Sequence, residues 1–168
     1  LMQKLINAGS DHSKFMRMIN VTADVTAPLY WWKEYDTYKV GTVANSCSTM
    51  HKIHAKKFTL DDFSHEHLFN GLDRCEKGRG DDEVWENPTT HLEVIINILN
   101  YYRNKFLEDG DKSYWWQMIQ LLPSSYNQRR TVELNYAVLR NMYHARKNHK
   151  LDEWREFCEY IKNNLPYA

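Results

Sequence analysis

Apolar and polar residues alternate most regularly between residues 15 and 27, FMRMINVTADVTA. The apolar members of this alternation are Ile19, Val21, Ala23, Val25 and Ala27. A period of two is typical of a strand that packs one face on the core. Pro28 follows, and its fixed φ suits the start of a helix. We therefore predict a half-buried strand that Pro28 ends, followed by a short aromatic helix.

A helical period dominates the second half of the chain. After Thr90, which we expect to cap the helix, residues recur at spacings of three and four as far as Gly110. They are Leu92, Ile95, Ile96, Leu99, Tyr102, Arg103 and Phe106. The pattern also predicts helices over residues 113–122, which Pro123 stops, and over residues 135–147 and 150–164. Residues 124–134 are predicted to be an irregular or extended connection.

Three short segments complete the predicted elements. Residues 1–8 are typical of the end of a helix that Gly9 terminates. Residues 48–57 are predicted to be helical, and Thr59 resembles the N-cap of one more short helix. Together the elements predict an α+β fold that forms a single domain over residues 1–168 and is rich in helix. Leu1 in place of an initiating Met leaves open an N-terminal segment before residue 1.

Residues 70–90 differ in composition from the rest of the chain. They hold three of the six glycines, one proline and many charged residues. Such a stretch is too polar to bury much surface. We therefore predict a mobile loop over residues 70–90.

Two pairs of adjacent tryptophans lie in predicted helices, Trp31–Trp32 and Trp115–Trp116. Neighbouring residues on a helix point in different directions. We therefore predict that one member of each pair lies in the core and that the other lines an interface.

Charge and composition exclude several classes of function. The 22 Lys and Arg residues balance 22 Asp and Glu residues, so no broad attraction to nucleic acid or to a membrane surface is expected. The chain has no run of eighteen apolar residues, and its three cysteines lack CxxC spacing. These features predict a cytoplasmic protein with reduced thiols. Aromatic residues make up 14% of the chain, which favours a flat ligand site, a wide protein interface, or both.

Cys47, His51, His54, His65 and His67 have the side chains of a zinc site. Their spacing matches no closed ligand pattern, so we predict no metal site. Nothing in the sequence brings Cys47 to a histidine that would activate it as a nucleophile.

A stretch that is polar but has little charge follows the aromatic helix. It contains Gly41, Thr42, Asn45, Ser46, Ser48 and Thr49. Hydroxyl, amide and backbone groups of this kind cradle a phosphate, a sugar or the edge of a heterocycle. The same residues also favour an ordinary turn between two elements. Composition leaves both interpretations open.

Asn135, Arg140 and Arg146 begin and line one predicted helix. Arg146 lies eleven residues after Asn135 and therefore within about 20° of it around the axis, whereas Arg140 lies about 140° away. One face would present an amide and a guanidinium, with a second guanidinium elsewhere. The alternative is that both arginines are solvated cations.

Residues 121–157 contain a Leu-Pro turn, a Thr-x-x-x-Asn segment that enters a helix with two arginines, and an amphipathic closing helix. This part of the chain resembles the end of the flavin-dependent thymidylate synthases (ThyX). The spacing of Asn135, Arg140 and Arg146 matches that family. Residues 4–17 resemble the family's Gly/His/Ser corner before its long strand. The resemblance implies a helix-rich ThyX-like fold with a small antiparallel sheet.

The family's signature segment is half kept. Asn45 and Ser48 stand where the Asn and Ser of its Asn-Glu-x-Ser-x-Arg-Tyr run would stand. Residues 38–40, Tyr-Lys-Val, replace its Arg-His-Arg, and Met50 replaces the later Arg, so three guanidinium positions in all are empty. The other replacements are Ser46 for Glu and His51 for Tyr. Phosphate groups need charged or backbone donors. The departures therefore predict weak binding of FAD.

The resemblance implies reductive methylation of dUMP, with hydride from reduced FAD and a methylene group from folate. It implies that Ser48 and Arg140 bind the nucleotide. The implied cofactor residues are Tyr38, Lys39, Asn45, Asn135 and Arg146. It also implies a homotetramer with active sites between subunits. Two alternatives are a non-catalytic nucleotide-binding or assembly protein on the same fold, and an enzyme that acts on another nucleotide.

Overall fold

The computed structural model describes residues 1–70 and 87–166, so most of the predicted mobile loop over residues 70–90 lies outside the described residues. The fold is α+β, rich in helix, with one small antiparallel sheet, as predicted. Within it the chain forms two compact units. The first comprises Leu1–Cys47 and Gln128–Ala168, and the second comprises Ser48–Asn127.

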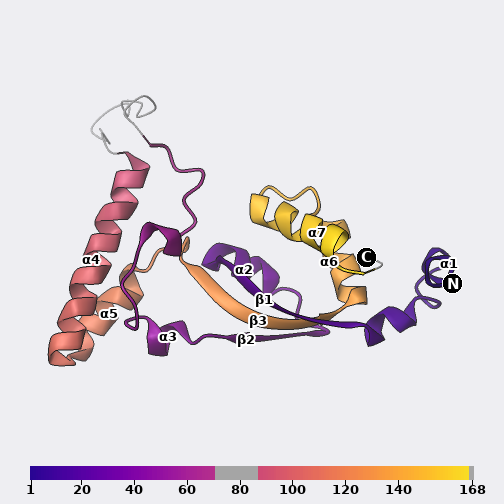
Figure 1. Ribbon diagram of the computed structural model, residues 1–168, viewed down its shortest axis with the longest axis horizontal. Helices are drawn as coiled ribbons and strands as arrows, with labels where there is room; N and C mark the ends of the chain where they lie inside the picture. Colours follow the sequence, from indigo (N-terminus) through magenta and orange to yellow (C-terminus); the bar gives the residue numbers. More distant parts are fainter. Residues whose placement is uncertain (71–86, 167–168) are drawn as a thin grey trace. The chain divides into compact units, whose positions relative to one another are not determined.

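The first unit is built on a three-stranded sheet in the order β1-β3-β2 (Figure 1). Strand β2 runs antiparallel to β3, in a register from Thr42 opposite Leu134 to Ser46 opposite Arg130. The elements of this unit are α1 (Met2–Asn7), the 3-10 helix η1 (Lys14–Met18), β1 (Asn20–Pro28), α2 (Leu29–Tyr35), β2 (Thr42–Ser46), β3 (Asn127–Asn135), α6 (Tyr136–Arg146) and α7 (Asp152–Asn164).

The predicted alternation of β1 is confirmed, although the strand begins at Asn20 because residues 14–18 form η1. Val21, Ala23 and Val25 are half-buried, whereas the residues between them are exposed. Helices α2, α6 and α7 lie on the buried face of the sheet (Figure 1). The residues on the opposite face are exposed and mostly polar, with Val43 as an apolar exception.

The sequence analysis did not identify the other two strands, β2 and β3. Residues 124–134, predicted as an irregular or extended connection, contain most of the central strand β3, and the polar stretch after α2 contains β2. Only Val132 and Leu134 of β3 are fully buried, and the other inward positions, Gln128 and Arg130, are polar, so the alternation of apolar residues is too short to recognise. The helix predicted over residues 48–57 is also shorter, since α3 spans only Thr49–Lys52.

The core of the first unit is aromatic. Trp31 and Trp32 are both 1% exposed, so the prediction that one of them leaves the core is wrong. The physical reason is that α2 is covered on two sides. The Trp31 ring stacks on Trp154 of α7 with the centroids 4.5 Å apart, while the Trp32 indole donates to the carbonyl of Gln128 at 2.9 Å.

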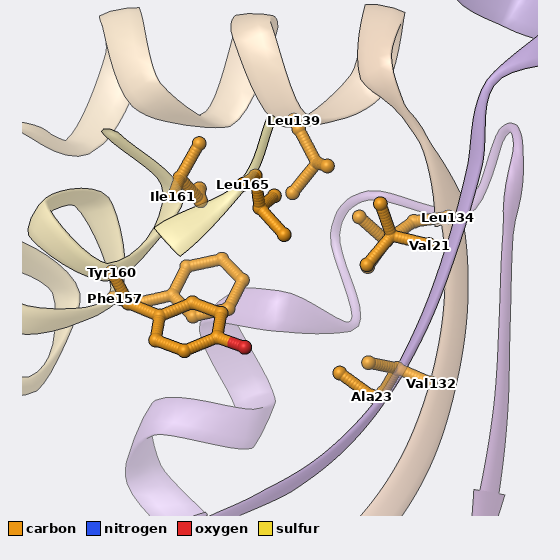
Figure 2. A pocket seen from close by; sticks show the side chains of 9 residues that line it. All are labelled: Val21, Ala23, Val132, Leu134, Leu139, Phe157, Tyr160, Ile161 and Leu165. Atoms are coloured by element: carbon orange, nitrogen blue, oxygen red, sulfur yellow. The ribbon is translucent and has the colours of Figure 1, made fainter. Parts of the chain in front are cut away.

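A small cavity remains between the sheet and α7 (Figure 2). Its volume is about 10 Å³. Its lining is formed by Val21, Ala23, Val132, Leu134, Leu139, Phe157, Tyr160, Ile161 and Leu165. A space of this size holds one water molecule at most. It is therefore a packing gap in the core and not a ligand site.

The second unit is built around the long helix α4 (Pro88–Asp109) and α5 (Lys112–Leu121), with α3 and the 3-10 helix η2 (Leu60–Asp62). The N-cap of α4 is Asn87 and not Thr90, because Asn87 accepts from Thr89 N–H and Pro88 occupies the first turn. Gly110 ends α4 at φ 69°, as predicted.

Two further predictions hold in this unit. Thr59 caps η2 through a capping box with Asp62. Trp115 packs against the core, as predicted for one member of that pair, and Trp116 is exposed, while its place in an interface stays a prediction.

Candidate functional site

An open hollow of about 400 Å³ lies between the end of α2 and the start of β2, wholly within the first unit. Its lining is formed by Tyr35, Asp36, Tyr38, Lys39, Thr42 and Ala44, and we call it the α2–β2 hollow. The Tyr38 ring beside the Lys39 ammonium group suits a flat ring that carries an anionic group. Tyr38 and Lys39, both predicted cofactor residues, thus lie together in it.

The turn that shapes the hollow is closed by local hydrogen bonds. The Tyr38 N–H donates to the Tyr35 carbonyl at 2.9 Å, and the Thr42 hydroxyl donates to the Tyr38 carbonyl. Gly41 adopts φ 76°, and a Cβ there would lie 3.1 Å from Val138 and 3.2 Å from the Asn135 amide nitrogen. Glycine therefore lets this turn approach the start of α6 and places Thr42 opposite Leu134.

Asn135 is the N-cap of α6. Its side-chain oxygen accepts from the Val138 N–H at 3.1 Å. This amide oxygen therefore already holds the helix start. The predicted role of Asn135 in flavin binding stays a prediction.

Arg146 is tied to residues of its own unit. Its Nε donates to the Tyr38 hydroxyl at 2.9 Å and its Nη1 to Glu34 at 2.7 Å. The guanidinium lies 5.0 Å from the centroid of the Trp154 ring, and the Arg146 side chain is 16% exposed. Arg146 thus fixes the ring of Tyr38 at the hollow, and its predicted role as a cofactor ligand stays a prediction.

The sequence analysis missed Arg130 and Tyr35. The Arg130 guanidinium donates to Asp36 at 2.8 Å and lies 4.3 Å from the centroid of the Trp32 ring. Tyr35 is 2% exposed, and its hydroxyl forms no hydrogen bond with the described residues. Burial and the charge of Asp36 raise the pKa of Tyr35 to about 12, against an opposing effect of Arg130. The available signal for Arg130 was its spacing of two residues from Val132 and of four from Leu134, which puts all three on the same face of a strand.

The structure does not bring Asn45 to the hollow. Ala44 lines the hollow, and adjacent residues of a strand point to opposite faces. Asn45 therefore lies on the exposed face, opposite Thr131, whose hydroxyl donates to Asp24 at 2.6 Å. The predicted cofactor residues thus divide between the two faces of the sheet.

The two predicted nucleotide residues belong to different units. Arg140 lies exposed on α6 and forms no hydrogen bond or ion pair with any described residue. Ser48 precedes α3 and belongs to the second unit. The meeting of Ser48 and Arg140 at one phosphate stays a prediction.

Residues 1–70 and 87–166 contain neither a cluster of metal ligands nor a helix that could span a membrane. No three His, Cys, Asp or Glu side chains in these ranges group together in a way that could hold a metal ion. No helix in the same ranges has the length and apolar character needed to cross a membrane.

Neither a protein-family model nor a curated protein matches this sequence. Solved structures do match. The chain is similar to two crystal structures of flavin-dependent thymidylate synthase ThyX from Helicobacter pylori, which contain FAD and dUMP. The sequence identities are 14% and 17%, and each match has a TM-score of 0.61 and covers 93% of this chain and 72% of that chain. The chain therefore has the ThyX fold, as its resemblance to the family predicted.

Proposed function

We propose that this protein is a divergent thymidylate synthase-like protein that binds dUMP and FAD and reductively methylates dUMP with folate and reduced flavin. The observation that carries the proposal is the match to the ThyX fold over 93% of the chain, to structures that contain FAD and dUMP. The α2–β2 hollow supports it, because Tyr38 and Lys39 fit a flat ring joined to phosphate.

The proposed roles follow the resemblance to the family. Tyr38 and Lys39 hold the flavin side, with Asn45, Asn135 and Arg146 as the further cofactor residues. Ser48 and Arg140 bind the nucleotide, and the free guanidinium of Arg140 suits its phosphate. Bound flavin supplies the hydride, so these residues act by binding and orienting the reactants.

A second candidate is a non-catalytic nucleotide-binding or assembly protein on the same fold, or an enzyme that acts on another nucleotide. The composition of the hollow favours it, because Lys39 is the only cation among the six lining residues. One ammonium group is a small charge complement for the diphosphate of FAD. We therefore expect FAD to bind weakly and substoichiometrically.

Calorimetric titration with dUMP tests the nucleotide site. We expect dUMP to bind and to raise the melting temperature. Arg140→Ala should remove a charge-assisted contact typically worth about 1.5 to 3 kcal/mol, which is roughly one to two decades of affinity. Arg155→Ala is the matched control, since Arg155 bonds its own helix start through Asp152 and the carbonyl of His149.

The outcomes separate the two candidates. Equal affinity in Arg140→Ala and the unmodified protein would remove Arg140 from the site. No response to dUMP, or to a panel of other nucleoside monophosphates, would leave only an assembly role. Visible absorption spectra during titration with FAD test the cofactor, and no binding at high FAD would end the redox proposal.

We also propose that the protein is a homotetramer with active sites formed between subunits. The aromatic content of 14%, with exposed residues such as Trp116 and Tyr101, is suited to wide interfaces. Light scattering at micromolar concentration tests this assembly, and a clean monomer would contradict it.

A further inference from the structure

Strand β2 is an edge strand of the sheet, and one row of its backbone groups faces away from β3 (Figure 1). The Cys47 N–H donates to the Arg129 carbonyl at 3.4 Å, which makes these two residues a hydrogen-bonded pair of the ladder. Such pairs alternate along an antiparallel ladder, so Val43 and Asn45 bond to β3, whereas the backbone N–H and C=O groups of residues 42, 44 and 46 point outward. These outward groups have no hydrogen-bond partner among the described residues.

The edge of β2 lacks the features that usually keep edge strands from pairing. Proteins protect a free edge with charged residues, with proline or with a bulge. Residues 42–46, Thr-Val-Ala-Asn-Ser, contain no charge and no proline, and their register with β3 is continuous. The other edge strand, β1, has Asp24 at its centre and Pro28 at its end. The sheet is therefore protected at β1 and open to pairing at β2.

The sequence of β2 is complementary to an antiparallel copy of itself. When Ala44 of one copy lies opposite Ala44 of the other, Thr42 lies opposite Ser46, and each of these pairs exchanges backbone hydrogen bonds because its groups point outward. No like charges meet in this register. Self-pairing of β1 about its centre would instead bring two Asp24 carboxylates together, which is destabilising.

Val43 adds an apolar contact to this edge. It is 67% exposed, although the face of the sheet that carries it is mostly polar. In the paired register Val43 lies opposite Asn45 of the second copy, and the second Val43 is its diagonal neighbour on the same face. Pairing therefore removes apolar surface of Val43 from water, which favours association.

We propose that two copies of this chain pair antiparallel through β2, about a two-fold axis at Ala44, and so join their sheets into one. The inference rests on the proposed homotetramer and identifies the strand that forms one of its interfaces. Thr42 and Ala44 also line the α2–β2 hollow, so the second copy places its Ser46 beside Thr42 at the rim of the hollow. The hollow thereby lies at the boundary between two copies.

A cysteine variant tests the register. Ala44→Cys in a Cys47→Ser background places two thiols opposite each other, at a backbone separation of about 5.5 Å that suits a disulfide. The background keeps Cys75 and Cys158 and removes the exposed thiol of Cys47. Val40→Cys in the same background is the matched control, because Val40 is 89% exposed but precedes β2, so that its counterpart lies at the far end of the paired strands.

The cysteine variants are treated with oxidised glutathione and compared on a non-reducing gel. We expect Ala44→Cys to give a covalent dimer, whereas Val40→Cys should give no more dimer than the Cys47→Ser background.

Ala44→Pro tests the hydrogen bonds of the interface. Proline lacks an N–H, and the Ala44 N–H points outward, so the variant keeps the ladder between β2 and β3 and removes a donor at the centre of the proposed pair. Light scattering should show a mass about twofold lower than that of the unmodified protein, with an unchanged far-ultraviolet circular dichroism spectrum.

The outcomes separate the interface from the proposed assembly. A dimer from Ala44→Cys alone supports the interface, as does a lower mass of folded Ala44→Pro. Equal cross-linking of both cysteine variants, no cross-linking of either, or an unchanged mass of folded Ala44→Pro overturns it. If Ala44→Pro does not fold, the cysteine variants decide the matter. An unmodified protein that is monomeric overturns the interface and the tetramer together, whereas an oligomer without the Ala44→Cys cross-link overturns the interface alone.

Discussion

The two units treat their buried polar groups differently. In the second unit the Asn100 amide is buried, and it accepts from the Phe58 N–H and donates to the Phe58 carbonyl, each at 2.9 Å. Asp62 is likewise paired with Thr59 and Lys56. In the first unit, Tyr35 and two tryptophans leave polar atoms without partners among the described residues. The second unit has one such atom, His54 Nδ1.

This difference identifies polar groups that serve the fold of the second unit. A buried amide that satisfies a backbone N–H and C=O pair completes the fold, so its loss weakens the protein. The Tyr35 hydroxyl is buried without a partner among the described residues, so its removal should cost little stability.

The largest effect is expected in the aromatic core of the first unit. Trp154 is 0% exposed and stacks on Trp31, so Trp154→Ala should lower the free energy of unfolding by about 3 to 5 kcal/mol. Urea denaturation measures the loss. Tyr160→Ala is the control on the same helix, because Tyr160 is 48% exposed and its loss should cost much less. Similar losses in both variants would contradict the assigned core.

A smaller loss is expected from the paired amide of the second unit. Asn100→Leu keeps a similar volume but leaves the Phe58 N–H and carbonyl buried without partners. We expect a loss of about 1 to 3 kcal/mol in urea denaturation. The exposed Asn97, on the same helix, provides the control Asn97→Leu. If Asn100→Leu were neutral, the pairing of the Asn100 amide with Phe58 would not contribute to stability, and the contrast between the two units would fail.

Local signals made most helices predictable from the sequence. Gly110 and Pro123 mark helix ends, and the apolar spacing of α4 gives the face that packs on the core. The central strand β3 was missed because its inward positions Gln128 and Arg130 are polar, which leaves only Val132 and Leu134 to show the alternation. That arrangement depends on pairing with strands far away in sequence, which local propensity does not encode.

The site was only partly predictable for the same reason. Tyr38 and Lys39 were identified because they occupy signature positions, and they do line the hollow. Arg146 was identified by its helical spacing, but its ion pair with Glu34 spans 112 residues and leaves no local trace in the sequence. Tyr35 was missed because an unpaired hydroxyl is visible only when every neighbour has been placed.

The smallest expected effect is the pH dependence of the Asp62 cap. Burial by itself would raise the pKa of Asp62, but hydrogen bonds from Lys56 and Thr59 outweigh it and lower the pKa below the ordinary value of 3.8. The folded state therefore binds the proton less tightly than the unfolded state. The stability from this cap is complete above the unfolded pKa and is lost as the pH falls through the folded pKa.

We expect Asp62→Asn to cost about 1 kcal/mol near neutral pH, which is typical of a lost cap. The difference from the unmodified protein should shrink as the pH falls below 3.8, the ordinary pKa of the carboxyl, because the lowered pKa of Asp62 lies below that value. Urea denaturation across this range measures the difference, with Asp61→Asn as the control at an exposed neighbouring carboxylate. A difference that stays constant with pH would mean that Asp62 stabilises η2 by packing and not by its charge. The second unit would then lose one of the two paired groups that distinguish it from the first.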